Sequence, residues 1–168
     1  LMPRFVAGLL ALAFAAPLAG AQTRSVDRDF RWEGAVPAGR WLYVRNLNGA
    51  IRVERATGTT ALIIAEKTWR RGNPEDVKIV VSKVGSGSQD VLVCALWFDN
   101  TECDEDGYRT RGNNRRDRDR WNRDNDVAVA FTIRLPEGVK LAVSSVNGGL
   151  DISGATSTVE ASTVNGGI

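Results

Sequence analysis

Acidic side chains are the residues of this chain that could catalyse a reaction. The sequence contains 20 Asp and Glu residues. Paired carboxylates cleave glycosidic bonds when one donates a proton and the other activates water or attacks the sugar. There is no histidine, which excludes Ser-His-Asp and Cys-His nucleophiles and every His-based metal site. The acids do not form a constellation fixed on adjacent strands, so we expect no catalytic residues and no cofactor.

Oxygen-bearing side chains gather in the middle of the chain, at Asp99, Asn100, Asp104, Glu105 and Asp106. Such oxygens are the ligands that calcium prefers, and calcium commonly stabilises extracellular β proteins. The spacing matches neither an EF-hand loop nor the calcium-binding nonapeptide of β-helices. We therefore interpret these residues as solvated loop acids and predict no metal site.

The stretch from Arg109 to Arg123 is rich in arginine and contains Trp121, with Tyr108 just before it. Cations interleaved with aromatic rings are typical of surfaces that bind nucleic acid or other polyanions. Residues 104–126, however, carry seven acids beside seven arginines, and the whole chain has a net charge of only +2. We therefore expect a long, solvated, charged loop over 104–126 and no nucleic-acid partner.

Four tryptophans, Trp32, Trp41, Trp69 and Trp97, lie in or beside segments that read as strands. Exposed aromatic side chains could form a platform for sugars, because they combine an apolar body with a polar end. Tryptophan in a strand more often fills a hydrophobic core, and the sequence leaves both interpretations open.

The first 21 residues have the pattern of a signal peptide. Arg4 gives a short basic start, residues 5–18 form a nearly continuous apolar run, and Ala19-Gly20-Ala21 supplies a small-x-small cleavage site. The apolar run is shorter than the roughly 20 residues that span a membrane. We expect cleavage before Gln22 and a mature chain without a transmembrane segment, exported to the periplasm, the cell surface or the medium.

Export determines how the two cysteines are interpreted. Cys94 and Cys103 are the only cysteines, and an oxidising compartment favours their pairing. A hairpin tip at residues 97–100 would place them opposite each other, within disulfide reach. We predict a structural disulfide that stabilises the fold by about 2–3 kcal/mol.

The C-terminal part of the chain contains an internal repeat. Residues 141–150 read LAVSSVNGGL and residues 159–168 read VEASTVNGGI, at an offset of 18. This period suits one coil of a β-solenoid. Asn-Gly pairs favour tight turns with positive φ, and a second glycine lets a neighbouring coil approach. The predicted repeat turns are therefore Asn147, Gly148 and Gly149, then Asn165, Gly166 and Gly167, with an amide ladder between the asparagines.

A more distant copy of this unit occurs near the start of the mature chain. Residues 36–59 align without a gap with residues 135–158 at an offset of 99, which matches Asn48-Gly49 to Asn147-Gly148. The shared pattern is a Pro-x-Gly turn, a strand, an Asn-Gly turn and a second strand. The repeated unit is therefore structural.

Four further segments between the copies are rich in β-branched residues and bounded by turn signals: 60–68, 77–84, 90–97 and 127–135. We predict an all-β protein with β-solenoid-like coils at its C-terminal end, preceded by an antiparallel or mixed β segment. The expected boundaries are a signal peptide (1–21), a linker and first strand (22–35), the β segment with its charged loop (36–135) and an incomplete solenoid (136–168).

With these motifs, residues 30–168 resemble the bacterial family of β-strand-repeat domains of unknown function that are named putative adhesins. The resemblance rests on LYVRNLNGAIRV near the N-terminus and on the VNGGLDISG-type coils. It implies a β-solenoid at the cell envelope, further coils beyond Ile168, and no catalytic residues to carry over. The charged insertion at 104–126 departs from the family pattern.

Together, these features predict a non-catalytic, extracytoplasmic, adhesin-like module that binds an envelope glycan or protein or has a structural role. The alternative is an envelope-acting lyase or hydrolase on a β-solenoid scaffold. A third expectation is a purely architectural role, because the unpaired strand edges of the last coil favour further coils, a cap or self-association.

Overall fold

The computed structural model describes residues 25–97, 100–110 and 125–168, and within them the fold is all-β. The strands are β1 (Ser25–Ala35), β2 (Trp41–Asn48), β3 (Ile51–Arg55), β4 (Thr60–Trp69), β5 (Lys78–Val84), β6 (Asp90–Leu96), β7 (Thr101–Asp104), β8 (Gly107–Thr110), β9 (Ala128–Leu135), β10 (Lys140–Asn147), β11 (Leu150–Ile152) and β12 (Val159–Asn165). Two short 3₁₀ turns, η1 (Pro74–Asp76) and η2 (Ser86–Ser88), flank β5.

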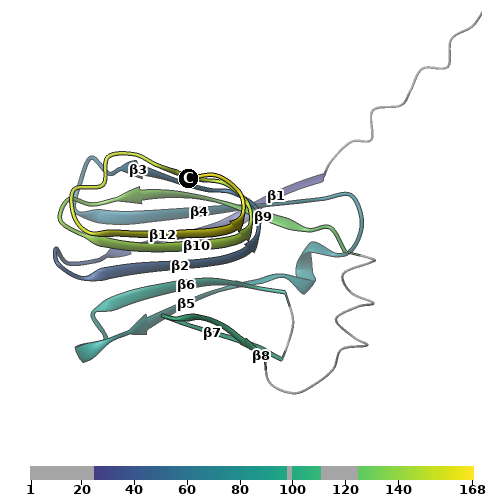
Figure 1. Cartoon of the computed structure of the whole chain (residues 1–168), viewed down its shortest axis with the longest axis horizontal. Helices are drawn as coiled ribbons and strands as arrows, with labels where there is room; N and C mark the ends of the chain where they lie inside the picture. The colour runs from purple at the N-terminus through teal and green to yellow at the C-terminus, as the bar shows by residue number, and fades with distance from the viewer. Residues whose placement is uncertain (1–24, 98–99, 111–124) are drawn as a thin grey trace, which may run out of the picture.

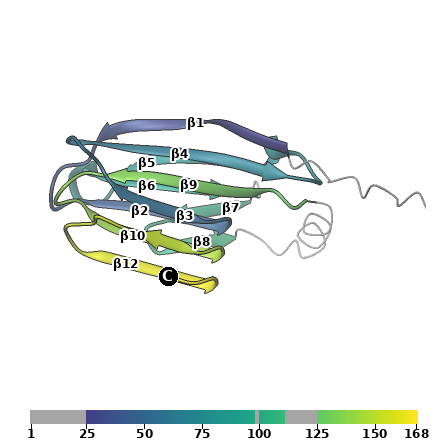
Figure 2. The same ribbon diagram turned by 90° about the horizontal axis from the view of Figure 1, so that it is seen from above.

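The strands form two five-stranded sheets and one separate hairpin (Figure 1). Sheet A has the order β1-β4-β9-β3-β11, and sheet B has the order β12-β10-β2-β6-β5. β1 lies at one edge of the molecule and β12 at the other, as Figure 2 shows. β7 and β8 pair only with each other, and their hairpin contacts sheet B at β6 and β2.

The core lies between the two sheets and is filled by alternate side chains of their strands. Alternation along a strand sends every second side chain to the same face. The inward residues of sheet B include Leu42, Val44, Leu141 and Val143, and those of sheet A include Ile51, Val53, Phe131, Ile133 and Leu150, all of them buried. Full burial of one such aliphatic side chain contributes about 1.5–3 kcal/mol, so this layer dominates the stability of the fold.

The repeated units lie side by side as parallel strands. β10 pairs with β12 at the 18-residue offset, so that Leu141 lies opposite Val159. β10 also pairs with β2, and β11 with β3, at the 99-residue offset, so that Leu150 lies opposite Ile51. The units β2–β3 and β10–β11 each cross from sheet B to sheet A through an Asn-Gly turn.

The structure shows open, mixed sheets rather than a series of coils. β1 and β9 both pair antiparallel with β4, and β5 pairs antiparallel with β6. The short connection at residues 85–89 joins the antiparallel neighbours β5 and β6, as short connections commonly do. The connection at residues 56–59 instead joins β3 to β4, and β9 lies between these two strands in the sheet. Strands of the 36–135 segment and of the 136–168 segment lie in the same two sheets. In sheet A, β3 pairs with both β9 and β11, and in sheet B, β2 pairs with β10.

The Asn-Gly turns work differently from the sequence prediction. Among Asn48, Asn147, Asn165 and the glycines that follow them, only Gly49 has a positive φ, of 121°. The first glycine of each later turn is required for close packing instead. A Cβ atom on Gly148 would lie less than 3.0 Å from the carbonyl oxygen of Gly49, whereas one on Gly149 would have a nearest neighbour at 3.6 Å.

Part of the predicted charged loop is an ordered hairpin. Residues 104–110 contain the end of β7, a turn, and β8. The carboxylate of Asp104 accepts hydrogen bonds from the backbone N–H groups of Asp106 and Gly107, and Gly107 has a φ of 134°. An Asx turn closed by glycine explains why this polar sequence reverses direction here.

The expected signal peptide and residues 111–124 of the charged segment lie outside the described residues. Across the described ranges, no helix has the length and apolar character needed to cross a bilayer.

Candidate functional site

The outer side of sheet B carries the main cluster of polar and aromatic side chains outside the core. The alternation along β2 buries Leu42 and Val44 in the core and turns Trp41, Tyr43 and Arg45 to the other side of the sheet. Lys140, on the neighbouring strand β10, lies opposite Trp41 in the register. We call these four residues the β2 aromatic row.

The four side chains form a continuous series of contacts. The rings of Trp41 and Tyr43 are stacked, with centroids 5.7 Å apart and planes inclined by 23°. The ammonium nitrogen of Lys140 lies 5.6 Å from the centroid of Trp41, and the guanidinium carbon of Arg45 lies 5.5 Å from that of Tyr43. A cation over an aromatic ring contributes about 0.5–1 kcal/mol at exposed sites, so these contacts hold the rings in place.

The two aromatic residues of the row keep their polar ends free of the protein. Both side chains are half-buried, and no hydrogen bond within the described residues engages the indole N–H of Trp41 or the hydroxyl of Tyr43. Elsewhere these groups are used internally. The indole N–H of Trp97 donates to the carbonyl of Val127, and the hydroxyl of Tyr108 bonds to backbone carbonyls.

Arg45 anchors one end of the row. Its side chain is only 8% exposed, and its guanidinium donates hydrogen bonds to the carbonyl oxygens of Ala142 and Glu105. Burial lowers the pKa of Arg45, yet arginine remains charged at any physiological pH. Its Nε is buried without a hydrogen-bond partner. Because the guanidinium is held by β10 and by the β7–β8 turn, Arg45 fixes Tyr43 rather than reaching outward.

The β7–β8 hairpin is fastened to sheet B beside the row. Cys103 of β7 forms a disulfide with Cys94 of β6, and their Cα atoms are 6.3 Å apart. The hydroxyl of Tyr108 lies 2.7 Å from the carbonyl oxygens of Arg45 and Ala95, to either of which it can donate. Burial raises the pKa of Tyr108, so this hydrogen bond persists at neutral pH.

The charges of three acidic side chains act on the ring of Tyr43. Burial, followed by the negative charges of Asp90, Glu105 and Glu160, raises the pKa of Tyr43. Glu160 follows from the register, because Tyr43 pairs with Ala142 and Ala142 pairs with Glu160. The carboxylate of Asp90 accepts a hydrogen bond from the backbone N–H of Trp41 at 2.9 Å, so it is committed to the backbone.

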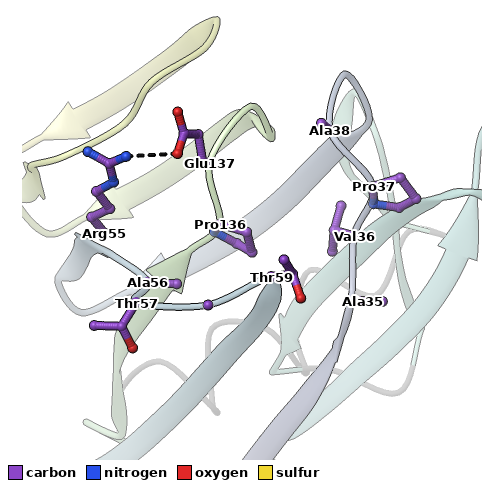
Figure 3. A pocket seen from close by; sticks show the side chains of 11 residues that line it. Ala35, Val36, Pro37, Ala38, Arg55, Ala56, Thr57, Thr59, Pro136 and Glu137 are labelled. Carbon is purple, nitrogen blue, oxygen red and sulfur yellow. Dashed lines mark hydrogen bonds and ion pairs between the residues drawn. The ribbon is translucent and has the colours of Figure 1, made fainter.

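A second candidate is an open hollow at one end of the sandwich, with a volume of about 830 Å³ (Figure 3). The connections β1–β2, β3–β4 and β9–β10 converge on it. Alanine and proline side chains form much of the wall, and the polar groups are the hydroxyls of Thr57 and Thr59 and an ion pair of 2.9 Å between Arg55 and Glu137. Both charges of this pair already neutralise each other, and no aromatic ring lines the hollow.

The structure separates the four tryptophans that the sequence suggested as a platform. Trp97 is buried in the core, and Trp32 and Trp69 are partly buried against it. Only Trp41 lies on the outer side of sheet B. Of the two interpretations that the sequence left open, core filling applies to these three tryptophans, whereas Trp41 lies on the surface with three partners that the sequence did not suggest.

The candidate calcium ligands are used in turn formation or lie outside the described residues. Asp104 closes the β7–β8 turn and forms an ion pair of 3.0 Å with Arg109. The backbone carbonyl of Glu105 accepts from Arg45. Asp99 lies outside the described ranges, within which no group of three or more His, Cys, Asp or Glu side chains could hold a metal ion.

The sequence did not predict Tyr43, Arg45 and Lys140 as site residues, because the repeat is recognised by its shared positions and these three residues are not among them. The signal was present in the same alignment, in the residues that differ. Between the matched apolar positions of residues 36–59 and 135–158, the first copy has Trp41 and Tyr43 where the second has Lys140 and Ala142. Alternation places exactly these positions on the outer side of the sheet.

Comparison with known proteins leaves the family open. No protein-family model matches the chain, and the search of curated proteins gave no match. Among solved structures, the chain is similar to the crystal structure of a "putative cell adhesion protein" from Clostridium sporogenes, with a TM-score of 0.38 and 10% sequence identity. The alignment covers 86% of this chain and 58% of that one, so the chain spans less than two thirds of that structure.

Proposed function

We propose that the chain is a non-catalytic, exported, adhesin-like β-repeat module that binds a component of the cell envelope through the β2 aromatic row. The observation that carries this proposal is the pair Trp41 and Tyr43, half-buried on the outer side of sheet B with both polar ends unused by the protein. Aromatic residues with an apolar body and a free polar end are enriched where proteins bind other molecules.

Rigidity also supports a binding role for this surface. The row is held by Arg45, which bonds to β10 and to the β7–β8 turn, and by the disulfide that fastens the hairpin to β6. Side chains that are already ordered lose little conformational entropy when a ligand binds, so less of the interaction energy is spent on ordering. A site on sheet strands is also positioned more precisely than one on loops.

We further propose that the units β2–β3, β10–β11 and β12, although they belong to open, mixed sheets, are stacked on one another as the coils of a β-solenoid are. The parallel register at an 18-residue offset supports this, as does the hydrogen bond of 2.8 Å from the side-chain amide of Asn165 to that of Asn147. The free edge of β12 exposes Val159 and Val164 and lacks the lysines, prolines and bulges that normally block edge strands. This edge would accept a further coil or a second copy.

The binding proposal is tested with the mature chain from Gln22, incubated with purified envelope fractions of the bacterium that produces it. We expect saturable binding that the double substitution Trp41→Ala/Tyr43→Ala weakens at least tenfold. Val80→Ala is the matched control, because Val80 is an exposed side chain of the same sheet, on strand β5.

Equal binding of the double variant and the control would contradict the proposal, provided that both have native circular dichroism. Release of soluble saccharide from the envelope fractions would instead support the alternative of a lyase or hydrolase.

A further inference from the structure

We infer that the ligand of the β2 aromatic row is an uncharged saccharide of the cell envelope rather than a polyanion, a lipid or a polypeptide. This inference rests on the proposed function, because it names the ligand of the same site. Three features of the row carry it: the mixture of hydrogen-bond donors and acceptors, the balance of charge, and the ring surface that remains exposed.

The exposed polar groups both donate and accept. The indole N–H of Trp41 and the ammonium group of Lys140 only donate, the hydroxyl of Tyr43 does both, and the carboxylates of Glu105 and Glu160 only accept. Sugar hydroxyl groups also donate and accept at the same atom, and they occur in adjacent pairs. A surface that combines donors with acceptors therefore complements a polyol better than it complements a ligand that only accepts.

The charge around Tyr43 argues against a polyanion. Arg45 is buried and committed to two carbonyl oxygens, so Lys140 is the one cation of the row whose charge faces outward. Glu160 lies exposed on β12, and the charges of Asp90, Glu105 and Glu160 all act on the ring of Tyr43. A chain of carboxylates or phosphates laid across this row would meet at least as much repulsion as attraction.

The exposed ring surface distinguishes a saccharide from a lipid or a peptide strand. Trp41 and Tyr43 cover each other, and each also contacts one cation, so the row offers narrow apolar strips between polar groups. Sugar rings present C–H groups and hydroxyls at similar short intervals. An acyl chain would leave the polar groups of the row unpaired. An extended peptide binds by pairing with the edge of a sheet, whereas the row lies on the face of the sheet.

The test uses the full mature chain and isothermal titration calorimetry at 50 and 300 mM NaCl. The neutral probes are pentamers of glucose, galactose and N-acetylglucosamine, and the anionic probe is a galacturonate pentamer. We expect one neutral pentamer to bind, with a Kd that changes less than threefold between the two salt concentrations, and no tighter binding of the galacturonate pentamer.

Three variants locate this binding. Trp41→Ala should weaken it at least tenfold, and Tyr43→Phe, which keeps the ring and removes the hydroxyl, should weaken it about fivefold. Thr57→Ala, in the hollow at the end of the sandwich, should leave it unchanged. Since Trp41→Ala could affect folding, Tyr43→Phe provides the decisive comparison, and each variant is compared with the parent by thermal unfolding.

The possible results distinguish an error in the proposed ligand from an error in the proposed site. Exclusive binding of the galacturonate pentamer, or a Kd that rises more than tenfold with salt, would overturn the uncharged saccharide and leave the binding proposal standing. A second result would also overturn the uncharged saccharide and leave the binding proposal standing. In that result an envelope protein binds, Trp41→Ala/Tyr43→Ala abolishes its binding, and no neutral pentamer binds. If envelope binding is insensitive to both row variants, the site and the ligand are both wrong.

Discussion

The inner and outer sides of the stacked strands β2, β10 and β12 differ in whether equivalent positions hold similar residues. On the inner side, equivalent positions hold equivalent residues, as in Leu42, Leu141 and Val159. On the outer side, equivalent positions hold Tyr43, Ala142 and Glu160, which share neither size nor charge. The repeat is therefore maintained where the strands pack, and it varies where the surface is free to bind.

On the inner side, the polar positions near the turns keep the same hydrogen bond from unit to unit. Asn46, Ser145 and Thr163 occupy the same place in the three units, and each donates a side-chain hydrogen bond to a turn carbonyl. Asn46 and Ser145 donate to Gly49, and Thr163 donates to Gly148. The residue type changes but the hydrogen bond remains, because a buried carbonyl without a partner costs about 1–3 kcal/mol.

The largest expected contrast between the two sides is in stability. Leu42→Ala, at a position with no exposure, should lower the free energy of unfolding by about 3 kcal/mol, because it leaves a cavity in the core. Tyr43→Ala, one residue away on the outer side, should cost less than half of that. Urea unfolding of both variants checks the comparison, and equal losses would mean that Tyr43 has a structural role.

The disulfide is the next largest effect, and it acts on the outer side alone. Replacing Cys94 and Cys103 together by alanine should lower the free energy of unfolding by about 2–3 kcal/mol in the chain-entropy model. Denaturation with and without reductant should give a similar difference for the parent chain and none for the double variant. A loss below 0.5 kcal/mol would show that Tyr108 and Arg45 hold the hairpin unaided.

The two glycines of one turn should differ sharply. Gly148→Ala forces the backbone of neighbouring turns apart and should destabilise the fold by about 2 kcal/mol. Gly149→Ala has its nearest neighbour at 3.6 Å and should change stability by less than 0.5 kcal/mol. Thermal unfolding of the two variants measures the difference, and the reverse order would contradict the packing of the turns.

Alkaline pH should act through the two tyrosines. Burial raises the pKa of both, so above pH 10 the unfolded chain loses these protons before the folded chain does. Stability is therefore full below pH 10 and falls above it, by at most about 1.4 kcal/mol per pH unit for each tyrosine. Urea unfolding between pH 8 and pH 11 measures this slope, which should be shallower in Tyr108→Phe. An unchanged slope would place the effect on other groups.

The smallest effect should come from the asparagine ladder. The hydrogen bond between Asn165 and Asn147 is exposed to solvent, so Asn165→Ala should cost only about 0.5 kcal/mol. Because this bond links two units, the ladder should matter more if further coils add to it. Comparing the variant in this chain and in a chain extended by another VNGG coil would show whether the effect grows with the number of coils.

The positions of the strands could be predicted from the sequence, but their order in the sheets could not. The segments 60–68, 77–84, 90–97 and 127–135 are strands to within two residues at each end, because alternation and turn residues are local properties. The parallel pairing of the repeated units also follows from their alignment. The mixed sheets did not follow, since nothing local indicates that β9 inserts between β3 and β4.

Unlike the strands, most of the candidate site could not be predicted from the sequence. The sequence suggested Trp41 together with three tryptophans that belong to the core, and it treated residues 104–110 as part of a loop. The contact of Arg45 with Glu105 joins residues 60 positions apart, and that of Arg45 with Ala142 joins residues 97 positions apart. No spacing within one segment predicts such contacts.

The β class, the repeat and its pairing follow from the amino-acid sequence, because they depend on alternation and on the residue types of turns. Three features become visible only in the folded chain: which tryptophan faces outward, which glycine of each turn is indispensable, and which side chains stand beside Tyr43. Those features depend on which strands become neighbours across the sheets. That choice follows from the packing of the entire core, so no single segment contains it.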